Sequence, residues 1–339
     1  MKKIILLALT FSCSFALLLG QNKVDSLVQI GIQYHDNGEY EKAIDAYKEA
    51  LKIEPKSTLV NYELAMTYMY AGDYEKSIKH SDVVIKQKKE HLLPAYITKG
   101  SSLDNLGKTE ESIKLFEEAI KDFGNDYLLL YNLAVNYVKL NNYEKAEPIL
   151  IDAINDNPNH ASSHRLLAIV KKEQNQRVQS LLGYYYFLLL EPTSQRAETA
   201  FESLKSQLKG SVNVDEKDSN HVNINIHPQH MDSEFSAAEL MISMLEASNL
   251  LEENKNKSEE ELFIENTKTF FSVLGELSGL DNKEGLWWNF YVPFFYELAK
   301  SDYMDVFCYY ISLSSNENAI IWLESNDEKF EDFGNWLGE

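Results

Sequence analysis

A short motif returns at a fixed interval along this chain. The segment 40–43, Tyr-Glu-Lys-Ala, recurs as Tyr-Glu-Lys-Ser at 74–77 and as Tyr-Glu-Lys-Ala at 143–146. The same small-residue position falls at Ser112 and Ser180, so the steps from Ala43 are 34, 35, 34 and 34 residues. Five units at such a period are typical of stacked supersecondary repeats rather than of a single globular core. The repeat therefore predicts an all-α array of helical hairpins.

The first unit displays the pattern in full. Small residues permit two helices to cross closely, aromatics fill the flanking space, a glycine permits the turn and a proline ends the second helix. These roles fall to Gly31, Tyr34, Gly38, Tyr40, Ala43, Tyr47, Ala50 and Pro55. The spacing resembles the tetratricopeptide repeat (TPR) family, and this resemblance implies a right-handed superhelix.

The other units keep the pattern with a few departures. The small and aromatic positions recur at Ala65, Tyr68, Gly72, Gly100, Gly107, Phe116, Ala119, Ala134, Tyr137, Ala153, Ala168 and Tyr184. Ser81, Lys89 and Phe187 depart from the pattern, and we expect their hairpins to pack less closely. Five hairpins then cover about 23–192, with an amphipathic cap over 194–208, so we assign the array to residues 21–209.

By the resemblance, the first helix of each hairpin lines a concave groove that binds a protein or peptide segment. The lining positions are then Val28, Ile32, His35, Tyr62, Met66, Met69, Tyr70, Ile97, Ser101, Asn105, Tyr131, Val135, Val138, Arg165, Ile169 and Lys172. Tyrosine and methionine suit an apolar segment, extended or helical. The Asn and Lys clamp by which chaperone-binding members grip a carboxylate is not found at these positions. The alternative is that the C-terminal region of the same chain fills the groove.

The N-terminus predicts export. Lys2 and Lys3 precede an apolar run from Ile4 to Leu19, and polar sequence begins at Gln21. We interpret residues 1–20 as a signal peptide, because the run is shorter than the roughly 20 apolar residues of a membrane span. The mature chain would then be periplasmic or extracellular, with no stable membrane span. Lipidation of Cys13 is disfavoured, because this cysteine lies inside the apolar run.

Charge is concentrated towards the C-terminus. Residues 231–339 hold 23 acidic and 6 basic side chains, out of a net charge of -21 for the chain. Nucleic acids and anionic membranes are bound through Lys and Arg, so this region disfavours both as partners. Cys308 is the single cysteine that remains after residue 20, which leaves no internal disulfide, and we expect it to be a buried apolar residue.

Residues 210–232 form a polar linker, in which alternating Val222, Ile224 and Ile226 predict a short strand or an extended segment. The linker histidines, His221, His227 and His230, could bind zinc, but their spacing matches no metal-binding signature. His160 and His164 are four residues apart and could share a helix face, but such a pair more often marks the start of a helix. We therefore predict no metal and no cofactor.

Residues 233–339 predict a second, acidic and aromatic-rich helical domain, or an elaborate cap fused to the array, of no family that we recognise. Helical periodicity covers 237–251, 258–277, 288–300, 303–313 and 319–324, followed by a short last helix. Ser258 and Glu261 form a capping box, Gly279 is a stop signal, and Asn326 is the cap expected for the last helix. The region contains all four tryptophans, Trp287, Trp288, Trp322 and Trp336. Their helical spacing favours a core over a stacking surface for sugars or cations.

No sequence motif of a catalytic centre occurs in the chain. We therefore predict a non-catalytic adaptor of the cell envelope or the extracellular space, which binds a partner segment in the groove. Two alternatives stay open for the C-terminal domain. One is binding of a glycan or small molecule, which exposed tryptophans favour, and the other is a helical hydrolase, which requires a deep pocket with placed carboxylates.

Overall fold

A computed structural model describes residues 23–210, 212–214, 222–224, 234–251, 254–279 and 283–338, and nearly all of them are helical. The all-α class and the succession of helical hairpins are as predicted. The chain divides into two compact units, Met1–Asn141 and Asn142–Glu339. This division falls inside the fourth predicted hairpin and not in the linker 210–232, because the last helices of the array pack with the C-terminal helices.

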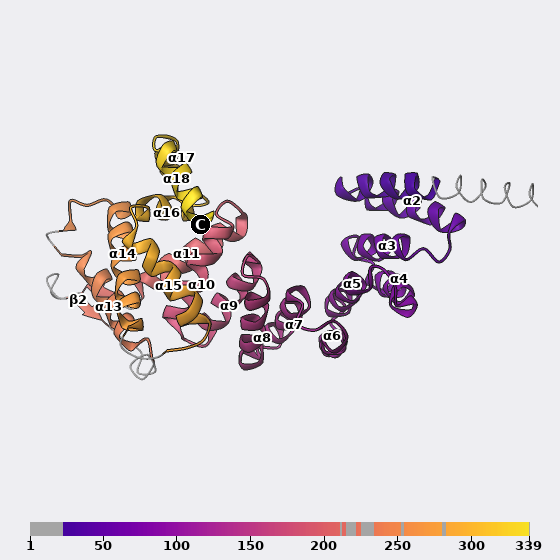
Figure 1. Ribbon diagram of the computed structural model, residues 1–339, viewed down its shortest axis with the longest axis horizontal. Helices are drawn as coiled ribbons and strands as arrows, with labels where there is room; N and C mark the ends of the chain where they lie inside the picture. Colours follow the sequence, from indigo (N-terminus) through magenta and orange to yellow (C-terminus); the bar gives the residue numbers. More distant parts are fainter. Residues whose placement is uncertain are drawn as a thin grey trace, which may run out of the picture. The chain divides into compact units, whose positions relative to one another are not determined.

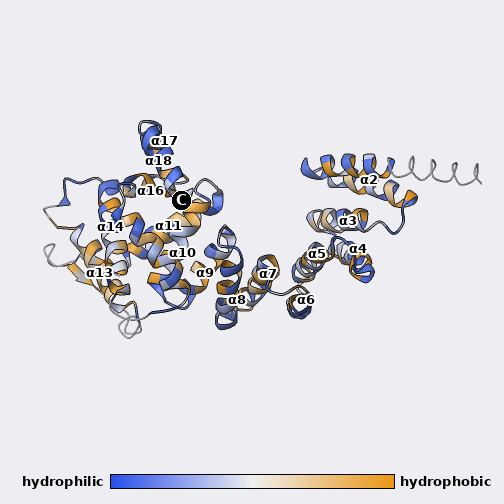
Figure 2. Ribbon diagram, viewed as in Figure 1, coloured by the Kyte–Doolittle hydropathy of each residue, from blue (hydrophilic) through white to orange (hydrophobic). Residues whose placement is uncertain are grey.

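The described part of the first unit is a row of helices, with orange and blue alternating along each as expected for amphipathic helices (Figures 1 and 2). Helices adjacent in sequence pack in pairs. In addition, α5 contacts both α3 and α7, so the first helices of consecutive hairpins lie side by side. The helices are 23–36, α2 (Tyr40–Ile53), α3 (Thr58–Tyr70), α4 (Tyr74–Gln87), α5 (Leu92–Asn105), α6 (Thr109–Phe123) and α7 (Tyr127–Lys139).

Close approach within a hairpin depends on glycine at the crossing. A Cβ atom added at Gly31 would lie 2.3 Å from the ring of Tyr47, and one at Gly100 would lie 2.2 Å from the ring of Phe116. The aromatic ring of the second helix therefore packs directly on the backbone of the first helix. This geometry explains why the repeat pairs a small residue with a large aromatic.

The recurring small position is fully buried in all five units, at Ala43, Ser77, Ser112, Ala146 and Ser180. At two of the serine positions, the hydroxyl forms a hydrogen bond to the first helix of the hairpin. Ser112 Oγ donates to the carbonyl of Gly100, and Ser180 Oγ donates to the carbonyl of Ala168, each at 2.8 Å. A buried hydroxyl needs such a partner. These bonds tie the two helices of a hairpin together.

The second unit contains the end of the array and the C-terminal helices (Figure 1). Its α10 is buried along most of its length and contacts α13, α16 and the π-helical turn η2. The elements are α8 (Tyr143–Asp156), α9 (Ala161–Glu173), α10 (Arg177–Leu190), α11 (Gln195–Lys209), α13 (Ser236–Ser248), α14 (Glu259–Ser278), η2 (Trp287–Tyr291), α15 (Val292–Lys300), α16 (Met304–Ile311), α17 (Glu317–Glu324) and α18 (Asp327–Gly338). The C-terminal region thus covers the last hairpin of the array.

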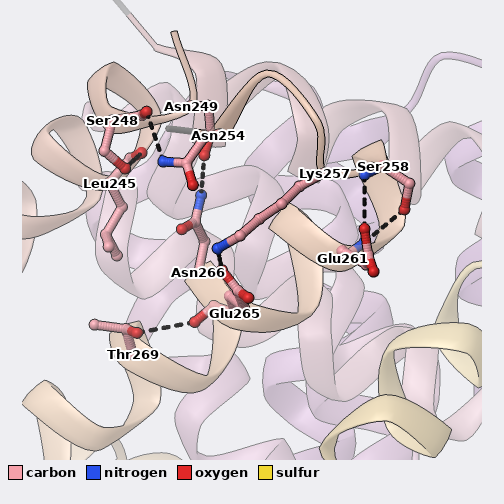
Figure 3. Close-up of polar contacts among 10 residues, drawn as sticks. All are labelled: Leu245, Ser248, Asn249, Asn254, Lys257, Ser258, Glu261, Glu265, Asn266 and Thr269. Atoms are coloured by element: carbon pink, nitrogen blue, oxygen red, sulfur yellow. Dashed lines mark hydrogen bonds and ion pairs between the residues drawn. The ribbon is translucent and has the colours of Figure 1, made fainter. Parts of the chain in front are cut away.

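Local signals mark the ends of the long helix α14. Ser258 Oγ accepts from the Glu261 backbone N–H, and the Glu261 carboxylate accepts from the Ser258 N–H, which is the predicted capping box (Figure 3). Gly279 ends the helix as predicted. Asn326 directly precedes α18, and its backbone carbonyl accepts from the Phe330 N–H at 2.9 Å, while its side-chain amide donates to the carbonyl of Trp322 at 2.8 Å.

Aromatic side chains build the core of the second unit. Tyr185 of α10 is fully buried, with its ring centroid 5.0 Å from that of Phe271 and 6.1 Å from that of Phe307. Trp287 and Trp288 are 7% and 4% exposed. The interpretation of these aromatics as core is therefore confirmed for the first two tryptophans, while Trp322 and Trp336 are half-buried.

A buried ion pair joins α10, α11 and α13. Arg177 donates to the carbonyls of Gln207 and Leu208 at the end of α11, both at 2.6 Å. Glu239 of α13 accepts from the Val178 N–H at 3.1 Å, and its other oxygen lies 3.8 Å from the Arg177 guanidinium. Both side chains thus satisfy backbone groups at helix ends.

In the linker region, β1 (Val212–Val214) pairs antiparallel with β2 (Val222–Ile224). The strand predicted there is present at Val222 and Ile224, whereas Ile226, the three linker histidines and residues 1–22 lie outside the described residues. Among the described helices, none combines the length and apolar character needed to cross a membrane.

Candidate functional site

The predicted lining positions of the first unit lie on α3, α5, α7 and the helix 23–36, and most of them are half-buried. Tyr70 is 58% exposed, and Asn105 is also exposed. Val28 differs, because it is 3% exposed and packs in the core of the first hairpin. Since α5 lies against both α3 and α7, the positions on these three helices form one continuous strip. We call this strip, together with Ile32 and His35 of the helix 23–36 at its α3 end, the first-helix strip.

One end of the strip is aromatic. The ring of His35 meets Tyr40 and Tyr70 edge-on, at centroid distances of 5.4 and 5.1 Å, and Tyr40 stacks on Tyr70. His35 Nδ1 is 2.9 Å from the Thr67 hydroxyl. Burial lowers the pKa of His35 below its usual value, although Asp36 opposes the effect. The His35 ring is therefore held in a neutral, apolar setting that suits an apolar ligand.

The middle of the strip is built around Tyr62. Its ring is parallel to that of His91, with centroids 5.4 Å apart, and its hydroxyl is 3.6 Å from the Met66 sulfur. His91 is the residue before α5 and has a left-handed backbone, with φ of 63°. Burial, and then the charge of Glu63, raises the pKa of Tyr62. Tyr62 is thus fixed from two sides while remaining partly exposed.

Towards α7 the strip becomes mixed in polarity. Ser101 Oγ lies 3.5 Å from Asn132 Oδ1, and Asn105 donates to the Ser101 carbonyl at 2.8 Å. Lys139 donates to the backbone and side chain of Asp104, both at 3.0 Å. The other apolar and aromatic positions of the strip are all half-buried, namely Ile32, Met69, Ile97, Tyr131, Val135 and Val138. Polar bonds between neighbouring first helices therefore hold the apolar positions in register.

The lining positions of the fifth hairpin belong to the second unit. Arg165 and Ile169 are half-buried on α9, and Lys172 is exposed. Nearby, Lys171 is buried, pairs with Glu147 and faces the ring of Trp287 at 5.6 Å. Burial lowers the pKa of Lys171, and Glu147 opposes this effect. In the second unit, the C-terminal region therefore contacts α9 and α10. These contacts favour the alternative that the chain's own C-terminal region fills this end of the groove.

His164 of α9 is a buried histidine with hydrogen bonds at both ring nitrogens. It is fully buried, with Nε2 2.8 Å from the Pro158 carbonyl and Nδ1 2.6 Å from the Tyr291 hydroxyl. A carbonyl can only accept, so Nε2 carries the proton and Nδ1 accepts. Both nitrogens are engaged, and His160 bonds to Ser163 instead of sharing a ligand with His164. Among the described residues, no group of three or more His, Cys, Asp or Glu side chains is arranged to hold a metal.

Three contributors to the first-helix strip escape sequence reasoning: Tyr40, Thr67 and His91. Tyr40 appeared only as a repeat residue, and Thr67 lies on the buried side of α3. His91 stacks on Tyr62 and has a left-handed backbone, for which the sequence has no signal.

The fold defines a helical-repeat protein whose consecutive first helices carry the partly exposed strip described above. The sequence profile of the tetratricopeptide repeat matches residues 24–57 and residues 106–182, so the chain contains TPR repeats, as the period predicts. A TPR repeat-containing protein of Methanocaldococcus jannaschii is 26% identical over 188 residues, which are 52% of this chain and 33% of that protein. Intraflagellar transport protein 70B of Rattus norvegicus is 27% identical over 136 residues, 39% of this chain and 19% of that protein.

Among solved structures, a thermophilic TPR protein of Thermus thermophilus aligns with a TM-score of 0.47 and 18% identity, covering 55% of this chain and 98% of that chain. The present chain spans a third or less of the length of the two curated relatives. The TPR repeats support a protein-interaction scaffold, and scaffolds of this kind are typically non-catalytic.

Proposed function

We propose that this chain is an exported, non-catalytic adaptor that binds a protein segment along the first-helix strip. The observation that carries the proposal is the continuity of partly exposed Tyr, Met, Ile and Val side chains on three adjacent first helices. Rigid aromatic rings bury a large area at a small entropic cost, and methionine adapts to the partner. An apolar segment, helical or extended, is the ligand class that fits.

Export is supported by the N-terminal sequence. Lys2 and Lys3 followed by an apolar run to Leu19 have the composition of a signal peptide. Cleavage after Gly20 would place the mature chain in the periplasm or outside the cell. N-terminal sequencing of the protein recovered from envelope and culture fractions tests this. A first residue of Gln21 is the expected result, and an intact Met1 in the cytoplasmic fraction would exclude export.

The alternatives for the C-terminal region have less support. Trp287 and Trp288 are buried, which removes them from a sugar-stacking surface. The hydrolase alternative requires carboxylates placed in a pocket, and Glu246, Glu259 and Glu260 do line a cavity of the second unit, so this alternative stays open beside the adaptor proposal. The adaptor function therefore remains the proposal for the first-helix strip.

The decisive experiment places a photo-crosslinking amino acid at Tyr70, in the chain that begins at Gln21. A crosslinked partner is identified, and its segment is synthesised as a peptide. The affinity of the peptide is then measured for the unchanged chain and for a Tyr62→Ala, Tyr131→Ala variant. Loss of two aromatic anchors should weaken binding at least tenfold.

Tyr96→Ala is the matched control, because Tyr96 is a half-buried tyrosine of α5 that packs on Phe123 and lies outside the predicted lining. Its affinity should stay within about twofold of the unchanged chain. Equal affinities of all three proteins for the peptide would remove the first-helix strip from the function.

A further inference from the structure

A cavity of about 280 Å³ lies in the second unit, among α11, α13, α14 and the segment that begins in α16. It is separate from the first-helix strip, whose residues all precede position 140. A water-sized group occupies about 30 Å³, so the cavity has room for a ligand of roughly ten non-hydrogen atoms. We call it the α11–α14 cavity.

One wall of the α11–α14 cavity is apolar. Phe201 and Leu208 of α11 and Cys308 of α16 are almost fully buried, and the ring of Phe263 meets that of Phe201 edge-on at 5.7 Å. Burial raises the pKa of the Cys308 thiol well above its usual value, so it stays neutral. This wall suits an aromatic or aliphatic body.

The lining of the cavity also includes carboxylates and side-chain amides of α14 and of the end of α13. Asn266 donates to Asn249 at 3.0 Å, a contact that Figure 3 shows between α14 and the end of α13. Asn249 in turn donates to one oxygen of Glu246 at 3.4 Å. These amides orient Glu246 and occupy only part of its acceptor capacity, because a carboxylate has about four acceptor sites.

The residues that line the cavity include more acidic than basic side chains. Glu246, Glu259 and Glu260 face Lys205 and Lys209. Lys205 is bound to Glu259 at 2.8 Å, and Glu260 accepts a 3.4 Å contact from the side-chain amide of Asn316. Burial raises the pKa of Glu246, although Arg177 and Lys209 oppose this effect. A ligand cation would stabilise the charged form of such a carboxylate.

We propose that the α11–α14 cavity binds a small organic ammonium ion, with its apolar body against Phe201 and Phe263 and its ammonium group between Glu246 and Glu260. The acidic surroundings, residues 231–339, attract cations over a longer range. The site is independent of the adaptor function, since it uses none of the first-helix strip.

The test uses three probes of nearly equal size: 2-phenylethylamine, 2-phenylethanol and phenylacetate. Binding to the full mature chain is measured by calorimetry, and by nuclear magnetic resonance of the Asn249 and Asn266 side-chain amides. The amine should bind with a Kd of about 1 mM or lower. It should bind about tenfold more tightly than the alcohol, because its charge-assisted bonds are stronger. Phenylacetate should bind more weakly than either.

Substitutions assign the contacts. Glu260→Gln and Glu246→Gln should each lower the preference for the amine over the alcohol by at least threefold, while leaving the affinity of the alcohol unchanged. Glu276→Gln is the control, since Glu276 is an exposed carboxylate of the same helix outside the cavity. Ser315→Trp, at an exposed lining position, should weaken the binding of all three probes. Ser325→Trp should not, because Ser325 is exposed but outside the cavity lining.

Several results would overturn the proposal. Phenylacetate binding as tightly as the amine would reverse the assigned charge preference. A preference for the amine that survives both glutamine substitutions would place the ammonium elsewhere. Absence of binding by all three probes at 10 mM would exclude the cavity as a site for ligands of about this size.

Discussion

The Ser112 hydroxyl takes part in two hydrogen bonds. It donates to the Gly100 carbonyl and accepts from the side-chain amide of Asn136 at 2.6 Å, and both side chains are buried. Replacing Ser112 with alanine leaves a buried amide without its acceptor. We expect Ser112→Ala to lower the free energy of unfolding by about 1–3 kcal/mol, measured by urea denaturation.

The chain contains its own control for Ser112. One repeat later, the equivalent positions are Ala146 and Val170, both fully buried. The double variant Ser112→Ala, Asn136→Val copies this apolar pair, and it should recover most of the stability lost in Ser112→Ala. A double variant that is less stable than Ser112→Ala alone would contradict the hydrogen-bond explanation.

The turn of each hairpin needs one residue with a left-handed backbone. Gly38, Gly72 and Gly107 provide it in the first three hairpins, with φ of 75° to 80°. Asn141 and Asn175 take the same position in the last two, with φ of 55° and 57°. The sequence identified the glycines, but it left the asparagines unassigned, because asparagine adopts this conformation only where the context requires it.

This equivalence predicts the outcome of substitution at Gly107, where an added Cβ atom would meet no neighbour within 4 Å. Gly107→Asn should cost less than about 1 kcal/mol of folding free energy, whereas Gly107→Val should cost more, because β-branched residues disfavour positive φ. Thermal unfolding of both variants measures the difference. Equal destabilisation by Asn and Val would show that the turn depends on something other than φ.

At the scale of elements, His164 links α9 to η2 and to the loop before α9. Burial lowers its pKa to about 4. The unfolded chain binds a proton near the ordinary value of 6.5 and the folded chain does not, so stability is lost as pH falls from about 6.5 to 4. The contribution of this one group reaches about 3 kcal/mol.

We therefore expect the free energy of unfolding of the unchanged protein to fall more steeply over pH 6.5 to 4 than that of His164→Gln. The glutamine keeps a donor and an acceptor but does not titrate. Urea denaturation at several pH values measures the two slopes, and other histidines contribute equally to both. Parallel curves would show that His164 is protonated in the folded protein.

Periodicity predicted most elements, but not their packing partners. The helices of the array follow from the 34-residue period, and Ser258 with Glu261 located the start of α14. The lining positions were implied by the resemblance to the TPR family, and the structure places all of them except Val28 at least partly at the surface. A cap fused to the array was one of two interpretations of the C-terminal region, but the helix that it covers could not be predicted, because a repeat period describes neighbours along the array and not a covering region.

At the scale of the whole molecule, sequence and structure divide the chain differently. The sequence predicts a boundary in the linker 210–232, where composition changes. The contacts divide the chain after Asn141 and join α8–α11 to the C-terminal helices through Tyr185, Arg177 and Glu239. A domain boundary should fall where few contacts cross, so the two divisions predict different fragments that fold on their own.

Two shortened chains distinguish these boundaries. Residues 142–339 retain the aromatic core around Tyr185 and the Arg177–Glu239 pair, so we expect a cooperative unfolding transition from this fragment. Residues 21–209 lose every C-terminal partner of α10, which exposes Tyr185 and the apolar side of that helix to water. This fragment should bind a hydrophobic dye and aggregate during thermal unfolding. The reverse result, with 21–209 monomeric and cooperative and 142–339 molten, would favour the boundary in the linker, because it would show that the array folds without the region that covers its last hairpin.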